Sequence, residues 1–510
     1  MQEVNPESTF RIISLKISHH PVLGNISLVF DNDNLHFGYI PEDIYTTVII
    51  GANGIGKTFL LKVIVDIFNY LYDLNNLPQS PRSLGFSFDI VYWYNEQTFR
   101  INNNAGEGNV RKNARVVDKM SCFINGISVG LNACLLPNVV IASAMTVSDK
   151  FPVKTEGGMY HYQGIRNENS PSTTGTRTLI RKTVEGLIKC LKVKGGYRQE
   201  LGILLDVLGF QHTLKILYQV KYKQVLLRDD MNPQLLCDII DNPDNKYFKR
   251  ETDLWGKRYF DKEVRNDVHK LEIICEFYQR LSRTLNLNQP RLSIEYDVFE
   301  QRIERDAEVL LLLSKLDFLS FPTLLVSKQE QYDFVNSSSG ETHLLCQMIG
   351  IMSDIKKGGV ILIDEPETSS HPNWQIQYIG WLKRIFREYR SCHFIISTHS
   401  HFLLSDLNPN TSTIIALVKK EDNGCLTNIG EGLNTFCWST DDILYRVFHV
   451  RNTRNFVFEG KVMSLYRMVS NREDKAKVIA LMEELSTYQL NEDDPLLKLM
   501  ETARQYVESI

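Results

Sequence analysis

One short segment constrains this chain more than any other. Residues 51–58 read Gly-Ala-Asn-Gly-Ile-Gly-Lys-Thr, and they stand between an apolar run at 46–50 and a helical run at 58–71. Glycines let such a loop curl so that its N–H groups face a phosphate, and the positive end of the following helix strengthens that field. The spacing G-x-x-x-x-G-K-T in this context predicts a phosphate-binding loop.

Each side chain of this loop has an expected task. Lys57 should reach the β- and γ-phosphates of ATP, and Thr58 should bind Mg²⁺. Asn53, Gly54 and Gly56 should line the phosphates with backbone N–H groups. The sequence therefore predicts ATP and Mg²⁺ as cofactors.

A second motif, Val360–Pro366, is an apolar strand that ends in two consecutive carboxylates. A buried strand that carries two acids at its tip needs a partner for their charge, and Mg²⁺ is such a partner. Asp364 is expected to complete the metal shell. Glu365 is expected to polarise the water that attacks the γ-phosphate.

Two weaker motifs accompany the strong ones. Ser337–Glu341 precedes a helical stretch, and a serine-glycine helix N-terminus binds anions, although taken alone it is more often an ordinary N-cap. Ser397–Ser400 follows the apolar run 393–396, and His399 at the tip of a strand can donate to a phosphate oxygen. A lone histidine there is more often a surface or core-edge residue.

In this order along the chain, the four motifs resemble those of the ABC-type ATPases of the SMC and recombination-repair branch. The resemblance covers about residues 10–165 and 295–410. It implies head-to-tail dimers in which Ser339, Gly340 and Glu341 form a signature that contacts the nucleotide of the opposite protomer.

The same resemblance makes His399 the switch histidine and places 367–371 in the loop that crosses the dimer interface. One departure from the family pattern concerns the glutamine of the Q-loop, which has no clear counterpart. Gln163, Ser148 and Asp149 all remain candidates for this third magnesium contact.

Stretches outside the ATPase motifs resemble a narrower family. Residues 136–152, 160–166 and the tail 441–506 are similar to PtuA, the ATPase of Septu-type and some retron-associated bacterial antiphage systems. The resemblance implies a homo-oligomer and a small HNH endonuclease partner, PtuB, whose DNA cleavage the ATPase controls. It leaves open whether DNA, or a retron RNA or DNA product, binds directly.

The hydrophobic pattern predicts an α/β fold: an ABC-type head with a mixed sheet, split by a helical insertion and followed by a C-terminal α-rich region. Strands are expected at 10–18, 25–32, 46–50, 291–299, 323–334, 359–364 and 393–398. Helices are expected between about 175 and 285, including 204–220 and 268–285. The predicted domains are 1–165, the N-terminal lobe; 166–290, the insertion; 291–410, the C-terminal lobe; and 411–510, the partner or assembly region.

Composition narrows the class further. A hydrophobic share of 43% with 23% charged residues is typical of a soluble globular chain, and a net charge of −4 gives no global basic field. No run is long and apolar enough for a membrane helix, and no secretory signal opens the chain, so we expect a cytoplasmic protein without membrane contact. The nine scattered cysteines are interpreted as buried thiols.

Two other functions remain open. An overcoming-lysogenisation-type nuclease would add a Toprim metal site, and Glu459 resembles its opening glutamate, but Asp493 and Asp494 lie in a polar turn. A repair-type DNA clamp would need long coiled-coil arms, and the insertion shows no sustained heptads. Residues 161–200 hold eight basic side chains against three acids, a pattern more typical of solvated helix faces than of a nucleic-acid surface.

Overall fold

The computed structural model describes most of the chain. The described residues are 9–31, 43–77, 83–103, 120–153, 158–166, 175–192, 197–242, 254–284, 292–419, 426–428, 432–448, 455–472, 474–488 and 495–508. The chain divides into a first unit, Met1–Ile443, and a second unit, Leu444–Ile510.

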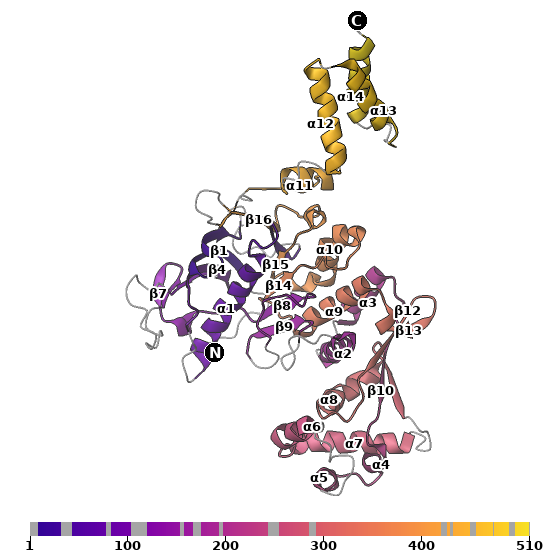
Figure 1. Cartoon of the computed structure of the whole chain (residues 1–510). Coiled ribbons are helices and arrows are strands. Elements are labelled where there is room, and N and C mark those ends of the chain that lie inside the picture. The colour runs from indigo at the N-terminus through magenta and orange to yellow at the C-terminus, as the bar shows by residue number, and fades with distance from the viewer. Residues whose placement is uncertain are drawn as a thin grey trace. The chain divides into compact units, whose positions relative to one another are not determined.

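A seven-stranded sheet of the first unit draws its strands from both ends of the sequence (Figure 1). Its order is β17-β16-β3-β15-β14-β8-β9. The strands are β3 (Tyr45–Gly51), β8 (Val140–Ala144), β9 (Tyr160–Gly164), β14 (Val360–Asp364), β15 (His393–Ser397), β16 (Ser412–Lys419) and β17 (Leu426–Asn428). All neighbours from β16 to β9 are parallel, whereas β17 runs antiparallel to β16. The predicted sharing of one sheet by two distant halves of the chain is confirmed.

A six-stranded antiparallel sheet, in the order β2-β1-β4-β5-β6-β7, shares its core with the seven-stranded sheet. Its strands are β1 (Arg11–His20), β2 (Gly24–Val29), β4 (Ser87–Tyr94), β5 (Gln97–Asn102), β6 (Ser121–Ile124) and β7 (Ile127–Val129). Helix α1 (Lys57–Asn76) is buried in the same core, where Phe68 packs edge-on against Phe10 with ring centroids 5.8 Å apart. Because only residues 52–56 separate β3 from α1, the first turn of α1 lies near the end of β3.

The insertion contains helices and one strand of a small sheet, whose other three strands follow the insertion in the sequence. Its helices are α2 (Thr176–Lys192), α3 (Tyr197–Leu208), α4 (Lys223–Leu226), α5 (Pro233–Asp241), α6 (Leu254–Tyr259) and α7 (Val268–Thr284), with a π-helical turn at Phe260–Val264. The sheet has the order β11-β10-β12-β13, with β10 (Leu214–Gln219), β11 (Ser293–Asp297), β12 (Thr323–Ser327) and β13 (Gln331–Asp333).

The predicted helix over 204–220 is wrong in its second half. Helix α3 ends at Leu208, and Gly209 follows with a φ of 69°. In β10 every second side chain is buried, which is the period of a strand with one covered face. Helix α7 lies where the pattern predicted it.

The helices of the C-terminal lobe are α8 (Gln301–Lys315), α9 (Ser339–Asp354) and α10 (Pro372–Ile385). Helix α11 (Thr440–Arg446) follows them and contains the division between the two units. Short 3₁₀ turns occur at Leu131–Ala133, Phe334–Asn336, Arg387–Tyr389 and His401–Leu404. Helix α9 packs on α2, where Gly186 has no room for a side chain larger than hydrogen without displacing Ile349. The insertion is thus attached directly to the helix that begins at the signature.

The second unit consists of α12 (Phe456–Ser470), α13 (Lys475–Ser486) and α14 (Pro495–Glu508). These helices bury a small apolar core, made of Leu465, Val478, Leu485, Leu496 and Ala503. A helical C-terminal region is therefore present, but it begins later than the predicted position 411. Strands β16 and β17 belong to the seven-stranded sheet, and the two units divide after Ile443.

The cysteines follow the predicted pattern in part. Most of those described are buried, but Cys237 is partly exposed and Cys437 is exposed, while Cys425 lies outside the described residues.

Among the described residues, no helix combines the length and the apolar character needed to span a bilayer.

Candidate nucleotide-binding site

The glycine-rich loop connects the end of β3 with the start of α1, as predicted. Gly54 and Gly56 have φ values of 73° and 109°, which favour glycine. A Cβ on Gly56 would lie 2.7 Å from a methyl of Leu23, and one on Gly51 would lie 2.8 Å from the carbonyl oxygen of Leu417. Packing as well as backbone conformation therefore requires glycine in this loop.

The hydroxyl of Thr58 meets the carboxylate of Asp364, which stands at the end of β14. The hydroxyl oxygen is 2.9 Å from Oδ2 and 3.1 Å from Oδ1, and the buried hydroxyl of Ser397 donates to Oδ1 from the neighbouring strand. Burial, assisted by nearby Glu365 and Asp149, raises the pKa of Asp364 to about 6. A threonine hydroxyl beside a carboxylate is a donor set that suits Mg²⁺, so these residues fit the metal that the sequence predicts.

Lys57 is turned toward His399, the residue expected to act as the switch histidine. Its Nζ donates to the carbonyl oxygen of Gly51 at 2.9 Å and lies 2.7 Å from Nε2 of His399. Burial lowers the pKa of Lys57 to about 8, against the opposing effect of the carboxylates of Glu365, Glu367 and Asp364. Burial and the charge of Lys57 also lower the pKa of His399. A lysine that donates to this ring requires an unprotonated nitrogen there.

Glu365 lies beside this pair and stays partly open to solvent. Its Oε1 is 3.6 Å from Nε2 of His399, and its backbone N–H donates to the carbonyl of Ser397 at 3.0 Å. The residue has a φ of 48°, which is uncommon for a side chain of this size and directs the carboxylate away from the strand. An accessible carboxylate at this place can orient a water molecule.

The signature residues lie elsewhere, at the start of α9. Ser338 is the N-cap, and Glu341 returns its carboxylate to the backbone N–H of Ser338 at 2.8 Å, which completes a capping box. Lys328 also pairs with Glu341, so the carboxylate predicted to bind nucleotide serves the helix end in this structure. Ser339 is exposed, whereas Gly340 is buried with its Cα hydrogen toward Ser369.

The structure therefore brings one group of predicted residues together and leaves another apart. The glycine-rich loop, Asp364, Glu365 and His399 meet at the ends of β3, β14 and β15. Gly340 instead faces the turn that follows Glu365, where a Cβ on it would lie 2.8 Å from the carbonyl oxygen of Ser369, and Ser339 is exposed beside it in the sequence.

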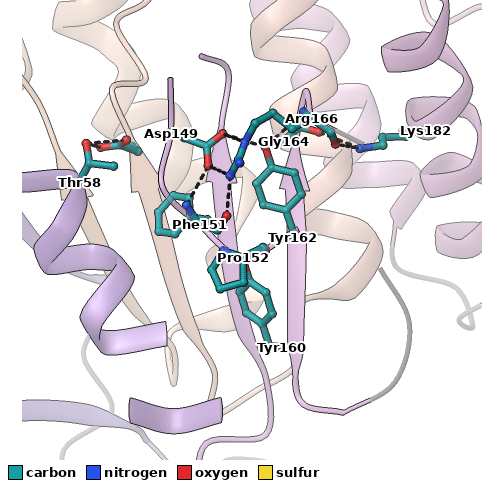
Figure 2. A network of polar contacts seen from close by, with 10 residues as sticks. Thr58, Asp149, Phe151, Pro152, Tyr160, Tyr162, Gly164, Arg166 and Lys182 are labelled. Carbon is teal, nitrogen blue, oxygen red and sulfur yellow. Dashed lines mark hydrogen bonds and ion pairs between the residues drawn. The ribbon is translucent and has the colours of Figure 1, made fainter. Parts of the chain in front are cut away.

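The three candidates for the Q-loop residue differ in their surroundings. Gln163 donates to Asp354 and Ser353 at the far end of α9, and Ser148 is exposed. Asp149 is fully shielded from solvent and forms a network with Arg166, whose Nε is 2.8 Å from Oδ2 (Figure 2). The hydroxyl of Tyr162 and the backbone N–H of Phe151 donate to the same carboxylate.

This Asp149 network is a feature that the motifs did not indicate. Lys182 of α2 extends it by donating to the carbonyl oxygens of Arg166 at 2.5 Å and Gly164 at 3.1 Å, as Figure 2 shows. The network fixes the segment after β8, which neighbours Asp364, to the first helix of the insertion. In the sequence, this network was indicated only by the residue types involved: Asp149 within 136–152 and Arg166 within 160–166.

The basic side chains of 161–200 mostly have acidic partners. The pairs are Arg166 with Asp149, Arg181 with Glu185, Lys189 with Asp354, Lys192 with Glu308, and Arg198 with Glu304. Lys194 lies outside the described residues. This pairing favours ion-paired helix faces over a nucleic-acid surface.

Comparison with known proteins gives a partial match by sequence. Residues 275–405 match the family described as "AAA domain, putative AbiEii toxin, Type IV TA system". This stretch includes the signature, Asp364, Glu365 and His399, and it does not include the glycine-rich loop. No curated protein matches the sequence.

Among solved structures, the fold is similar to SMC head domains and to the recombination mediator RecF. The SMC head domain from Thermotoga maritima has 11% identity and a TM-score of 0.31, with 82% of this chain and 98% of that chain covered. The recombination mediator RecF with ATPrS has 11% identity and a TM-score of 0.32, with 83% and 99% covered. An SMC head bound to the C-terminal winged-helix domain of ScpA has 12% identity and a TM-score of 0.30, with 83% and 99% covered. Similarity at this level carries no argument about function, which depends on the residues of the site.

Proposed function

We propose that this chain binds and hydrolyses ATP as an ABC-type ATPase. One observation carries the proposal: the hydroxyl of Thr58 bonds to Asp364 while Lys57 lies against His399. Thr58 and Asp364, expected to hold the metal, thus lie next to Lys57 and His399, expected to contact the γ-phosphate. The two residues are 306 positions apart in the sequence in the first pair and 342 in the second.

The geometry suggests a role for each group. The N–H groups of the loop and the ammonium of Lys57 bind the phosphates at the positive end of α1. Thr58 and Asp364 would hold Mg²⁺, which supplies charge neutralisation on the β- and γ-phosphates when bound. Glu365 accepts a hydrogen bond from the attacking water and orients it, and His399 donates to the γ-phosphate.

The signature supports a head-to-tail dimer. Ser339 is exposed at the first turn of a sixteen-residue helix, where backbone N–H groups attract anions. The glycine-rich loop already surrounds the phosphates on its own side, so the signature of one protomer would serve the nucleotide of a second copy. Closed two-fold pairing would then complete two sites at once.

The biological role we propose is control of a partner HNH endonuclease in a bacterial antiphage system, in the cytoplasm. The support comes from the PtuA-like stretches, two of which supply β8, β9 and the network between Asp149 and Arg166. The matched family description also names a putative toxin, which is compatible with a defence function. Direct binding of DNA or of a retron RNA or DNA product remains a further hypothesis.

The alternative function as a Toprim nuclease rested on one residue, Glu459, whose position in the structure does not support it. Glu459 lies in the first turn of α12, not at the end of a strand, so its interpretation as the opening glutamate of a Toprim site is wrong. Among the described residues, no group of three or more His, Cys, Asp or Glu side chains could hold a metal ion. Asp493 and Asp494 lie outside the described residues.

Phosphate release from ATP by the purified chain tests the ATPase proposal. We expect Mg²⁺-dependent release whose rate per chain rises with protein concentration until the dimer saturates. Release no faster than that of a Lys57→Ala preparation would contradict hydrolysis, and a rate per chain that is independent of concentration would contradict the dimer.

The proposed role needs a separate experiment. Co-expression with an HNH endonuclease encoded beside the gene should give a complex whose DNA cleavage changes with ATP. The same complex made with the Lys57→Ala chain should lose that response, and an unchanged response would remove the regulatory role.

A further inference from the structure

Glu367 makes a contact that none of the four motifs requires. It lies three residues beyond Asp364, and its Oε1 accepts a hydrogen bond from the backbone N–H of His399 at 2.6 Å. This bond joins the loop after β14 to the segment after β15. It thereby attaches one candidate functional loop to another.

The surroundings of this carboxylate are largely apolar. Glu367 lies among the side chains of Leu344, Pro366, Trp374, Tyr378, Trp381 and Leu403, with Ser370 and Gln375 as the polar neighbours. Its second oxygen, Oε2, is shielded from solvent and has no hydrogen-bond partner among the described residues. Burial raises the pKa of Glu367. A carboxyl group in such a place lowers stability relative to a well-packed apolar side chain, so packing alone does not account for it.

His399 is held from two sides. Its ring lies against the ammonium of Lys57, with Nε2 at 2.7 Å from Nζ, and its backbone N–H is held by Glu367. The preceding residue, Thr398, donates its N–H to the carbonyl of Ile49 in β3 at 3.0 Å. The direction in which the ring points therefore depends on the backbone bond to Glu367.

Glu367 also begins the turn that touches the signature. The N–H of Ser370 donates to the carbonyl of Glu367 at 2.9 Å, which closes the turn. The carbonyl oxygen of Ser369 lies so near Gly340 that a Cβ there would approach it to 2.8 Å. A displacement of this turn cannot occur without a change at Gly340.

We propose that Glu367 is a positioning residue: its carboxylate fixes the backbone of His399 so that the ring reaches Lys57, and it links that position to the turn packed on Gly340. This inference deepens the proposed ATPase function and rests on it. Within one protomer, the glycine-rich loop would thereby influence the signature. That signature contacts the nucleotide bound by the partner protomer.

Three variants separate positioning from general stability. Glu367→Ala removes the acceptor, whereas Glu367→Gln keeps a carbonyl oxygen in the same place. Asp306→Asn is the control for the loss of a carboxylate elsewhere in the fold. Asp306 is buried in α8, a helix that carries no site residue, where it bonds to Tyr296 at 2.8 Å and pairs with Arg280 and Arg305.

In steady-state assays, Glu367→Ala should lower kcat by roughly 10-fold to 100-fold, as expected for a misplaced catalytic group. The Kd for ATP should change less than kcat, because the glycine-rich loop and the side chain of Lys57 are still present. Glu367→Gln should recover most of the rate, and Asp306→Asn should leave kcat per folded chain unchanged. Added to His399→Ala, the alanine at 367 should cause no further loss. Additive losses, or an equal loss in Asp306→Asn, would overturn the inference.

A measurement without turnover distinguishes this inference from the proposed function. The amide proton of His399, bonded to a carboxylate, should resonate far downfield in isotope-labelled protein and move upfield in Glu367→Ala, but not in Asp306→Asn. An unchanged signal in Glu367→Ala overturns the positioning role even in an active ATPase. An inactive wild-type chain with the expected shift instead overturns the ATPase proposal.

Discussion

The ammonium of Lys57 lies 2.7 Å from the Nε2 of His399, a residue 342 positions further along the chain. In this arrangement the lysine that should hold the phosphates is bonded to protein acceptors, including the carbonyl of Gly51 at 2.9 Å. An arriving nucleotide must replace these acceptors with phosphate oxygens. If the chain binds ATP as proposed, this contact is one that the nucleotide must break.

Replacement of Lys57 by alanine should reduce ATP binding severely, to the point of abolishing it at ordinary nucleotide concentrations. The phosphate charge would then be compensated by loop N–H groups and the helix end, without the charge-assisted hydrogen bond. A titration with a fluorescent ATP analogue should show a loss of affinity of at least about 10-fold, which is the loss of one hydrogen bond to a charged group. Retained affinity would contradict the assignment of the loop.

Glu365→Gln should bind ATP and hydrolyse it slowly. The amide cannot accept the water proton, while Thr58 and Asp364 keep the groups that suit Mg²⁺. We expect kcat to fall by about 10²-fold or more, consistent with the loss of a general base. Size-exclusion chromatography with ATP should then show an accumulated dimer. Wild-type turnover in this variant would mean that another residue orients the water.

Ser339→Arg should bind ATP normally and fail to hydrolyse it, because its own glycine-rich loop is intact and its signature is blocked. Mixed with the Lys57→Ala chain, it should recover partial activity. In the mixed dimer one composite site carries both defects and the other carries neither.

An inactive mixture is informative once the mixed dimer has been shown to form. Either the two sites do not act in trans, or hydrolysis requires both sites at once. The concentration dependence of wild-type hydrolysis decides between them, since a rate per chain independent of concentration favours the first.

Arg166→Ala should destabilise the first unit. It leaves Asp149 buried without its cationic partner, and breaking a buried ion pair from one side costs about 3–5 kcal/mol. Arg100→Ala is the control: it breaks an ion pair with Asp89 at an arginine that is 53% exposed, and exposed pairs contribute about 0–1 kcal/mol. Thermal unfolding should show a large fall in midpoint for the first variant and a small one for the second. Equal shifts would contradict a special role for the network.

Without a partner, the chain should leave plasmid DNA intact in the presence of Mg²⁺ or Mn²⁺. The first turn of α12, where Glu459 lies, offers helical and not strand-end geometry. Agarose electrophoresis provides the measurement. Cleavage that disappears specifically in Glu459→Ala would restore the nuclease alternative.

The site residues that follow strands were predictable from sequence. A short apolar run that ends in polar residues is typical of a buried strand with its polar residues at the edge of the sheet. This holds for Asp364 after β14 and His399 after β15. Strand β10 was missed because its neighbours, β11 and β12, are distant in the sequence, and a strand among helices looks like one more amphipathic helix.

Contacts made by backbone atoms were not predictable in the same way. The backbone N–H of His399 donates to Glu367, and a backbone donor is present at almost every residue, so the residue types do not indicate this bond. From the sequence, Glu341 could either cap the helix or bind a ligand. The position of Ser338 in the structure shows that Glu341 caps the helix.

Strand β3, which leads into the glycine-rich loop, lies between β15 and β16. Its hydrogen-bond partners are therefore synthesised long after it, when the ribosome has added the residues up to Lys419. Contacts between such distant segments form slowly and leave apolar edges exposed in the meantime. A nascent chain should consequently lack a nucleotide pocket until nearly all of the first unit has been translated, and chains released early should depend on chaperones or be degraded.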